Sequence, residues 1–199
     1  MTSKFADYAP RSEGPERPPR LAASDGLVIR ESRGSDLVPV AEIATEREGQ
    51  TLRDWRVVFG RFHEESQTTE RSLLLVAALH EDVIGYGKAA YFTPPTGSAP
   101  NVAPEGWYLT GVVVRPEYRR RGVGKALTTA RLSWIAARSA TVYYVANERN
   151  RVSIELHGAI GFEERSRDFY HPGVSFTGGA GILFACDLRG WNSQRTSPS

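Results

Sequence analysis

The residues best suited to chemistry lie in a short basic turn, residues 119–125, between a predicted strand and a predicted helix. The turn holds four basic side chains and two glycines, Gly122 and Gly124, one residue apart. At the N-terminus of a helix, consecutive backbone N–H groups carry partial positive charge, and glycines let a ligand approach them. Arginine side chains add charge-assisted hydrogen bonds to phosphate. This arrangement predicts a turn that binds a pyrophosphate.

Two well-known phosphate-binding loops do not fit this turn. A P-loop requires Gly at the position of Arg119 and Ser or Thr at the position of Ala126. A dinucleotide fingerprint requires Gly or Ala at the position of Leu127. The alternative interpretation is a solvated basic turn before an ordinary helix. The apolar strand, the proline and the amphipathic helix around the turn favour phosphate binding over that alternative.

A second motif follows at residues 150–162, which read Asn-Arg-Val-Ser-Ile-Glu-Leu-His-Gly-Ala-Ile-Gly-Phe. It resembles the Asn-x-x-Ala/Ser-Ile-x-Leu-Tyr/His-x-x-Leu-Gly-Phe segment of the GNAT superfamily of acyl-CoA N-acyltransferases, with Ile160 in place of Leu. Residues 119–124, Arg-Arg-Arg-Gly-Val-Gly, resemble the Arg/Gln-x-x-Gly-x-Gly/Ala signature of the same superfamily. Two motifs in the family's order and at its separation identify the chain as similar to GNAT enzymes.

The resemblance implies that acetyl-CoA is the cosubstrate and that no metal takes part. In relatives, the strand before the turn pairs with the pantetheine arm like an added strand, and the amides of the turn hold the diphosphate. Parallel strands that splay apart leave unpaired backbone groups for such an extended ligand. The residues implied in cofactor binding are Val112, Val113, Val114, Arg119, Arg120, Arg121, Gly122, Val123, Gly124, Lys125, Asn150, Ser153 and His157.

The same resemblance implies residues for the transfer step. His157 stands where many relatives carry a Tyr that protonates the departing CoA thiolate, and an imidazole can supply that proton near neutral pH. Without the motif, a lone His on an apolar helix would be interpreted as structural. Asn150 is expected to cap the helix and to contact the cofactor, with Ser153 also on the leaving-group side. The amide of Val112 is expected to polarise the thioester carbonyl.

The sequence leaves several candidates for the general base. An aliphatic ammonium has a pKa of about 10 and must lose a proton before it attacks. Many relatives place a Glu where this chain has Thr110, and a threonine cannot act as a base at neutral pH. Glu64 and Glu65 are the acidic residues we select, and Asp54 and Glu105 are also in segments that border the acceptor cleft in relatives. Taken one at a time, carboxylates such as these are more often solvated surface charges.

The hydrophobic pattern predicts a single α/β (α+β) domain between two polar ends. The elements follow in the order β-α-α-β-β-β-α-β-α-β-β, which implies the GNAT fold, a mixed central sheet of about six to seven strands flanked by about four helices. We expect a flexible leader at residues 1–26, the acetyltransferase domain at 27–188 and a flexible tail at 189–199. The individual elements are expected at 27–31, from Ser35 into the 40s, 52–65, 72–79, 83–92, 107–114, 122–138, 141–145, 150–161 and from 162 to 188.

Composition excludes several functional classes. The 199 residues carry 25 Lys and Arg against 23 Asp and Glu, a formal charge of +2 that argues against a dedicated nucleic-acid binder. Residues 115–125 hold five of those 25 bases and one of those 23 acids, so the positive charge is concentrated at the predicted phosphate site. One cysteine and four scattered histidines form neither a disulfide framework nor a zinc site. The absence of a long apolar run or an h-region predicts a cytoplasmic protein without membrane partners.

The sequence therefore predicts an acetyl-CoA-dependent N-acetyltransferase that modifies a primary amine of a small molecule. An aminoglycoside-type antibiotic, a polyamine or an amino acid derivative would fit, and antibiotic resistance is one role that follows. The alternatives are a protein N-terminal or lysine acetyltransferase and a non-catalytic CoA-binding regulatory module. Cys186 lies in an apolar strand with no nearby His, which favours direct transfer in a ternary complex over an acyl-cysteine intermediate. Assembly as a homodimer is left open.

Overall fold

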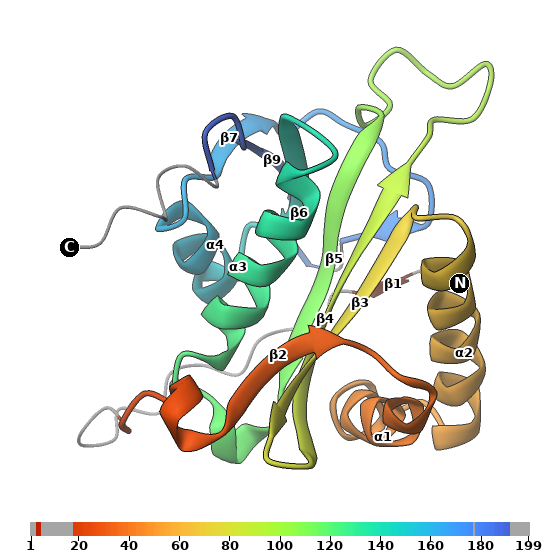
Figure 1. Ribbon diagram of the computed structural model, residues 1–199. Helices are drawn as coiled ribbons and strands as arrows, with labels where there is room; N and C mark the ends of the chain where they lie inside the picture. Colours follow the sequence, from red (N-terminus) through yellow and green to blue (C-terminus); the bar gives the residue numbers. More distant parts are fainter. Residues whose placement is uncertain (1–2, 5–17, 177, 192–199) are drawn as a thin grey trace. The chain divides into compact units, whose positions relative to one another are not determined.

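The computed structural model describes residues 3–4, 18–176 and 178–191 (Figure 1). Within them, the α-helices are α1 (Leu37–Glu48), α2 (Leu52–Thr68), α3 (Val123–Ala136) and α4 (Arg151–Gly158). The strands are β1 (Ser3–Lys4), β2 (Leu27–Glu31), β3 (Ser72–Leu79), β4 (Asp82–Phe92), β5 (Gly106–Val114), β6 (Thr141–Asn147), β7 (Glu163–Ser166), β8 (Val174–Ser175) and β9 (Gly181–Asp187). Three short 3-10 helices are η1 (Ala23–Asp25), η2 (Gly34–Asp36) and η3 (Pro116–Tyr118).

The strands form the mixed sheet that the sequence predicts. Seven strands pair in the order β2-β3-β4-β5-β6-β9-β7, and β1 and β8 form a separate two-stranded pair. β2, β3 and β4 are antiparallel neighbours, whereas β5 and β6 run parallel. The predicted mixed sheet of about six to seven strands with about four helices is therefore confirmed, whereas the short strands β1 and β8 were not predicted.

The chain divides into two compact units, which are described separately. Unit A comprises the described residues 18–90 and 110–132, and unit B comprises 3–4, 91–109 and 133–191, without residue 177. Unit A thus contains the basic turn, and unit B contains the Asn150 motif. β5 is shared between them, since Thr110 onward belongs to unit A.

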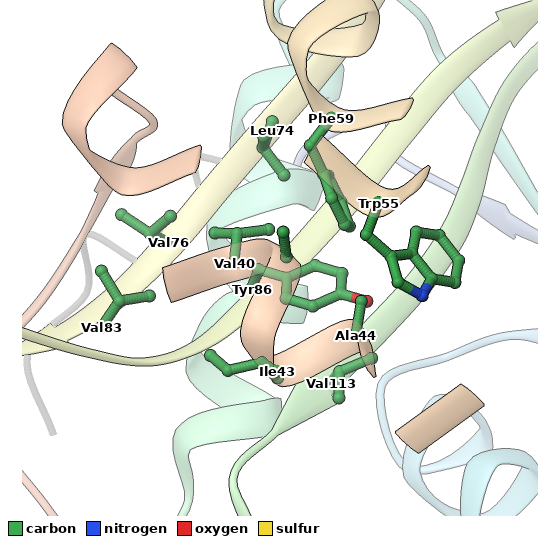
Figure 2. Packing of buried hydrophobic residues seen from close by; sticks show 11 residues of the cluster. Val40, Ile43, Ala44, Trp55, Phe59, Leu74, Val76, Val83, Tyr86 and Val113 are labelled. Atoms are coloured by element: carbon green, nitrogen blue, oxygen red, sulfur yellow. The ribbon is translucent and has the colours of Figure 1, made fainter. Parts of the chain in front are cut away.

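The core of unit A lies between the helices α1 and α2 and the strands β3 and β4 (Figure 2). The ring of Phe59 is completely buried, and its centroid lies 5.6 Å from that of Trp55 and 5.1 Å from that of Tyr86. β3 is buried along nearly its whole length, which explains its uninterrupted apolar sequence. Val113 of β5 belongs to the same cluster, so the core reaches the strand that precedes the basic turn.

The first helix starts later than predicted. We expected it to open at Ser35, but residues Gly34–Asp36 form the 3-10 helix η2, and α1 begins at Leu37. The Asp36 carboxylate accepts hydrogen bonds from the backbone N–H of Arg33 and from the guanidinium of Arg30, at 2.6 Å each. This pairing holds the tighter turn ahead of the helix. The predicted end of the third helix was also too late, since α3 ends at Ala136.

Unit B is built around the pairing of β6 with its neighbours. β5 pairs in parallel with β6 from Trp107 opposite Val142 to Leu109 opposite Tyr144, and β9 pairs antiparallel with the other edge of β6. Aromatic residues fill the core, and Tyr108 stacks on Tyr143 at 5.2 Å. The predicted short helix ends at Gly158 rather than at Gly161.

The predicted leader and tail fall partly outside the described residues, which leave out 1–2, 5–17 and 192–199. Of the leader, residues 3–4 and 18–26 are described and include β1 and η1, and of the tail, residues 189–191 are described. β2 begins at Leu27 and β9 ends at Asp187, at or next to the expected limits of the domain. The flexibility of the two ends stays a prediction. Among the described residues, no helix has the length and apolar character needed to cross a membrane.

Candidate active site

The basic turn of unit A has the backbone geometry of an anion-binding loop. Between η3 and α3, Arg120 has φ +64° and Gly122 has φ +88°, both in the left-handed region. Left-handed residues within a turn make successive N–H groups converge, which creates a concave surface of donors. α3 follows at once at Val123, and the first N–H groups of a helix have no partner inside it. Glycine at position 122 meets this conformation without strain.

The basic side chains in the turn and just before it differ in what they contact. Arg115 forms ion pairs with Glu46 at 3.0 Å and Glu42 at 3.6 Å, so its charge is neutralised. Arg119, in contrast, is exposed, and its Nε donates to the Val114 carbonyl at 3.0 Å. The remaining bases of the turn are Arg120, Arg121 and Lys125. Within the described residues, no carboxylate lies within 4 Å of them or of Arg119, so their charges are available to a polyanion.

The strand before the turn presents backbone groups that are already engaged by side chains. The carbonyl of Val112 accepts from Arg47 of α1 at 3.3 Å, and that of Val114 accepts from Arg119. A carbonyl oxygen has two lone pairs, so a pantetheine amide would share these acceptors or displace the arginines. The side chain of Val113 is buried, so its predicted role in cofactor binding is limited to the backbone. The same holds for Val123, which is 1 % exposed.

Arg131 of α3 was not predicted, although it fixes the strand at Gly111. Its side chain is completely buried, and one terminal nitrogen, Nη1, donates to the Lys88 carbonyl of β4 at 2.8 Å and to the Gly111 carbonyl of β5 at 3.1 Å. The other nitrogens donate to the Thr128 hydroxyl and the Leu127 carbonyl. Burial lowers the pKa of Arg131 to about 9, which leaves it charged at neutral pH. Arg131 thus joins two strands next to Val112.

Lys88 is a second cation that no sequence motif indicates. Its ammonium lies over the rings of Phe59 and Phe62, 5.5 Å from each centroid. Burial lowers the pKa of Lys88, because removing an ammonium from water disfavours its charged form. A methyl group added to Gly111 would lie 4.0 Å from Cε of Lys88, so this side chain reaches the strand beside Val112. Its contacts with the two aromatic rings distinguish it from a surface lysine.

The Asn150 motif of unit B is compact and well connected. The Asn150 side chain accepts from the N–H of Ser153 at 3.2 Å, which confirms the predicted helix cap. His157 is 3 % exposed, and its Nδ1 lies 2.8 Å from the Ser153 carbonyl and 3.4 Å from the Ser153 hydroxyl. Since a carbonyl only accepts, this contact assigns the proton to Nδ1. The imidazole stacks on Tyr144 with centroids 4.0 Å apart.

The hydroxyl of Tyr144 is the unusual polar group beside His157. It is buried, and no hydrogen bond of normal geometry reaches it from the described residues. Burial raises the pKa of Tyr144 to about 12, and the nearby Ser153 side chain acts in the opposite direction. Tyr144 therefore stays protonated at neutral pH.

The acidic candidates for a general base have different surroundings. At the start of α2, the carboxylate of Asp54 already accepts a hydrogen bond from the Thr51 hydroxyl at 2.7 Å. Glu105 in unit B accepts from the Thr93 hydroxyl at 3.2 Å. Glu64 and Glu65 are exposed on α2, and among the described residues their carboxylates have no hydrogen bond or ion pair. Thr110 of unit A is also exposed.

Comparison with protein families decides the assignment. The chain matches the Acetyltransferase (GNAT) family over residues 37–162, more than half of its length. The chain belongs to the GNAT acetyltransferase family. The matched segment contains both motifs that carried the resemblance, and it begins at the first residue of α1.

Solved structures with the GNAT fold resemble this one despite low sequence identity. The PaiA N-acetyltransferase of Thermoplasma acidophilum in complex with coenzyme A is 17 % identical, with a TM-score of 0.61 over 81 % of this chain and 98 % of that one. A ribosomal-protein-alanine N-acetyltransferase of Brucella melitensis is 20 % identical, with a TM-score of 0.62 over 80 % and 99 %. At such identities the likeness shows the fold alone. No curated protein sequence matches the chain.

The GNAT motifs fall into two groups within the structure. Residues 112–114 and 119–125 lie together in unit A with Glu64 and Glu65, and the helix α4 with Asn150, Ser153 and His157 lies in unit B. The sequence patterns located both groups. They did not reveal Arg131 or Lys88, because no motif contains these residues and only the tertiary contacts mark them. No group of residues within the described part could hold a metal ion.

Proposed function

We propose that this GNAT protein transfers the acetyl group of acetyl-CoA to a primary amine of a small molecule, directly and within a ternary complex. The observation that carries the proposal is the turn 119–125, with its left-handed backbone, its helix N-terminus and its exposed cations. These groups suit the diphosphate of coenzyme A. That the Asn150 motif serves the same cosubstrate is inferred from the family pattern.

The transfer step needs one bond formed and one broken. The neutral amine nitrogen attacks the thioester carbonyl carbon, and the carbon–sulfur bond then breaks to leave the CoA thiolate. The N–H of Val112 would stabilise the negative charge that develops on the carbonyl oxygen. Arg131 and the β4–β5 contact at Gly111 would hold Val112 in position for this hydrogen bond.

After attack, the nitrogen must lose one more proton to become an amide, and His157 would take up that proton and give it to the CoA thiolate. Its Nδ1 proton is directed at the Ser153 carbonyl, so Nε2 is the nitrogen that would exchange a proton with the leaving group. The stacked Tyr144 and the helix keep the ring in one orientation. Asn150 and Ser153 fix the turn of the helix from which the ring projects.

The proton of the substrate ammonium would leave through water to Glu64 or Glu65. Both carboxylates are exposed and have no hydrogen bond or ion pair among the described residues, so water can reach them. Thr110 would at most orient the water. Acidic groups on α2 also favour a cationic acceptor, such as a polyamine or an aminoglycoside-type antibiotic.

A thiol-based route is disfavoured by the surroundings of Cys186. The thiol is 4 % exposed in β9, and burial raises its pKa, so the reactive thiolate is scarce. We expect Cys186→Ala to retain at least half of the wild-type kcat. Loss of turnover in Cys186→Ala, together with an acetylated form of the wild-type protein that accumulates during the reaction, would contradict direct transfer.

An acceptor screen tests the proposal. Purified protein with acetyl-CoA is assayed for release of the CoA thiol against polyamines, aminoglycosides, amino acid derivatives and short peptides. Multiple turnovers with a small amine would support the proposal. Turnover with peptides alone would support a protein N-terminal or lysine acetyltransferase; the Brucella melitensis neighbour also acts on a protein, as a ribosomal-protein-alanine N-acetyltransferase. CoA binding without any turnover would support a regulatory module, the alternative raised by Thr110.

A further inference from the structure

Residues 19–21 of the leader lie directly on the basic turn. The N–H of Leu21 donates to the carbonyl of Arg121 at 2.9 Å, and Nε of Arg121 donates to the carbonyl of Pro19 at 3.3 Å. These two hydrogen bonds join positions 102 and 100 residues apart in sequence. Residues 19–21 therefore lie against the turn, although they precede the segment that matches the family, which begins at residue 37.

Arg20 stands between these two anchors. A Cβ added to Gly122 would lie 3.9 Å from Cγ and 4.0 Å from Cδ of Arg20, so its aliphatic stem runs past the central glycine of the turn. The side chain is exposed, and no carboxylate or hydrogen-bond partner of its guanidinium is found among the described residues. A free guanidinium is thus held beside the proposed diphosphate site.

The leader engages the turn in a way that leaves the phosphate donors available. It uses the carbonyl of Arg121, an acceptor, and none of the N–H groups of residues 120–125 donates to the backbone of the leader's described residues. Capping that carbonyl removes a partial negative charge that would repel a phosphate. The bond from Arg121 to Pro19 also directs one of the turn's own guanidiniums toward the leader, and Arg20 adds another cation in its neighbourhood.

We propose that Arg20 is a phosphate ligand of the CoA site, and that residues 19–21 complete this site from outside the segment that matches the family. The ligand group is a phosphate of coenzyme A, either the diphosphate or the 3′-phosphate. This inference rests on the proposed function, because it needs the turn to bind CoA. It assigns to the leader a role in cosubstrate affinity.

The test measures CoA affinity by isothermal titration calorimetry on full-length variants at one salt concentration. Loss of one charge-assisted hydrogen bond at an exposed site should weaken CoA binding by ~10-fold in Arg20→Ala, and charge reversal in Arg20→Glu should weaken it further. Arg20→Lys should fall between Arg20→Ala and the wild type, because it keeps the charge but loses the planar donor pair. Arg61→Ala is the matched control, an exposed arginine of α2 that should leave CoA affinity unchanged.

The choice of nucleotide separates the two phosphate sources. If Arg20 binds the 3′-phosphate, 3′-dephospho-CoA should bind wild type and Arg20→Ala equally. If it binds the diphosphate, the ~10-fold difference should persist with both ligands. In the acetyl-transfer assay the KM for acetyl-CoA should rise in parallel, while kcat and the acceptor KM stay constant.

Three results would each refute either the role of Arg20 or the proposed function. Equal CoA affinity of wild type, Arg20→Ala and Arg20→Glu would overturn the role of Arg20 and leave the proposed function intact. Tighter binding by Arg20→Ala would also overturn it and show that the leader obstructs the site. No CoA binding by the wild type would instead refute the proposed function. Melting temperatures equal to that of the wild type would show that these substitutions change CoA binding and not the stability of the protein.

Discussion

The turn 119–125 and the helix segment 150–157 belong to one family pattern, yet their physical surroundings differ. In the turn, function depends on backbone N–H groups and exposed cations, held by left-handed residues at 120 and 122. In the helix segment, the side chain at 157 is buried, hydrogen-bonded and stacked on an aromatic ring. One region is an open electrostatic surface, and the other is part of a packed core.

The difference has a physical cause in the chemistry proposed for each region. A polyanion is bound by many weak, oriented donors that must remain hydrated until the ligand arrives. A single proton donor must instead be held in one tautomer and one orientation, which packing and hydrogen bonds supply. Substitutions in the turn should therefore change affinity, and substitutions around position 157 should change the rate constant or the stability.

The largest effect is expected at Gly122. Gly122→Glu should weaken CoA binding by about 1,000-fold, or about 4 kcal/mol, because it places a non-glycine residue at φ +88° and a negative charge against phosphate. Calorimetric titration with CoA measures this. Gly190→Glu is the control, since Gly190 has φ +77° with no neighbouring atom within 4 Å, and it should keep normal affinity. Normal CoA affinity of Gly122→Glu would refute the phosphate role of the turn.

Arg131→Met should be the most destabilising of the substitutions considered. It leaves the carbonyls of Lys88 and Gly111 without their buried donor, which should lower the free energy of unfolding by about 3 kcal/mol. Urea denaturation measures the change. Arg138→Met is the control, because Arg138 is exposed and stacks on Trp134, and it should cost about 1 kcal/mol or less. Equal losses for both variants would mean that the buried contacts contribute no special stability.

His157→Asn separates a catalytic from a structural histidine. The asparagine amide can still donate to the Ser153 carbonyl, but it cannot protonate a thiolate. We expect kcat to fall about 100-fold, with the KM for acetyl-CoA changed less than threefold. The pH profile of kcat should also lose the limb due to the imidazole. An unchanged kcat in a folded variant would show that His157 serves only the core.

Asn150→Ala should have the smallest effect on stability. Loss of the helix cap should cost about 1 kcal/mol, seen as a lowered melting temperature. Asn150→Asp keeps a capping oxygen and should restore stability. If Asn150 also contacts CoA, the aspartate variant should recover its melting temperature but not its CoA affinity, whereas recovery of both would limit Asn150 to capping.

Local patterns determined the elements of this protein because their spacing reflects burial. The apolar positions of α1 and α2, the uninterrupted β3 and the cap at Asn150 were all readable in sequence. The start of α1 was placed two residues early, since the ion pair of Asp36 with Arg30 stabilises a 3-10 turn that hydrophobic spacing does not encode.

The sequence alone determined the family, the order of elements and the two motifs, because these depend on residue types a few positions apart. The tertiary structure decided which charges matter. It buried Arg131 against two strands, laid Lys88 on two phenylalanine rings, neutralised Arg115 and brought Arg20 to Gly122. Each of these outcomes joins residues distant in the chain, and the formal charge of an arginine or lysine is the same in sequence whether it is buried, paired or free.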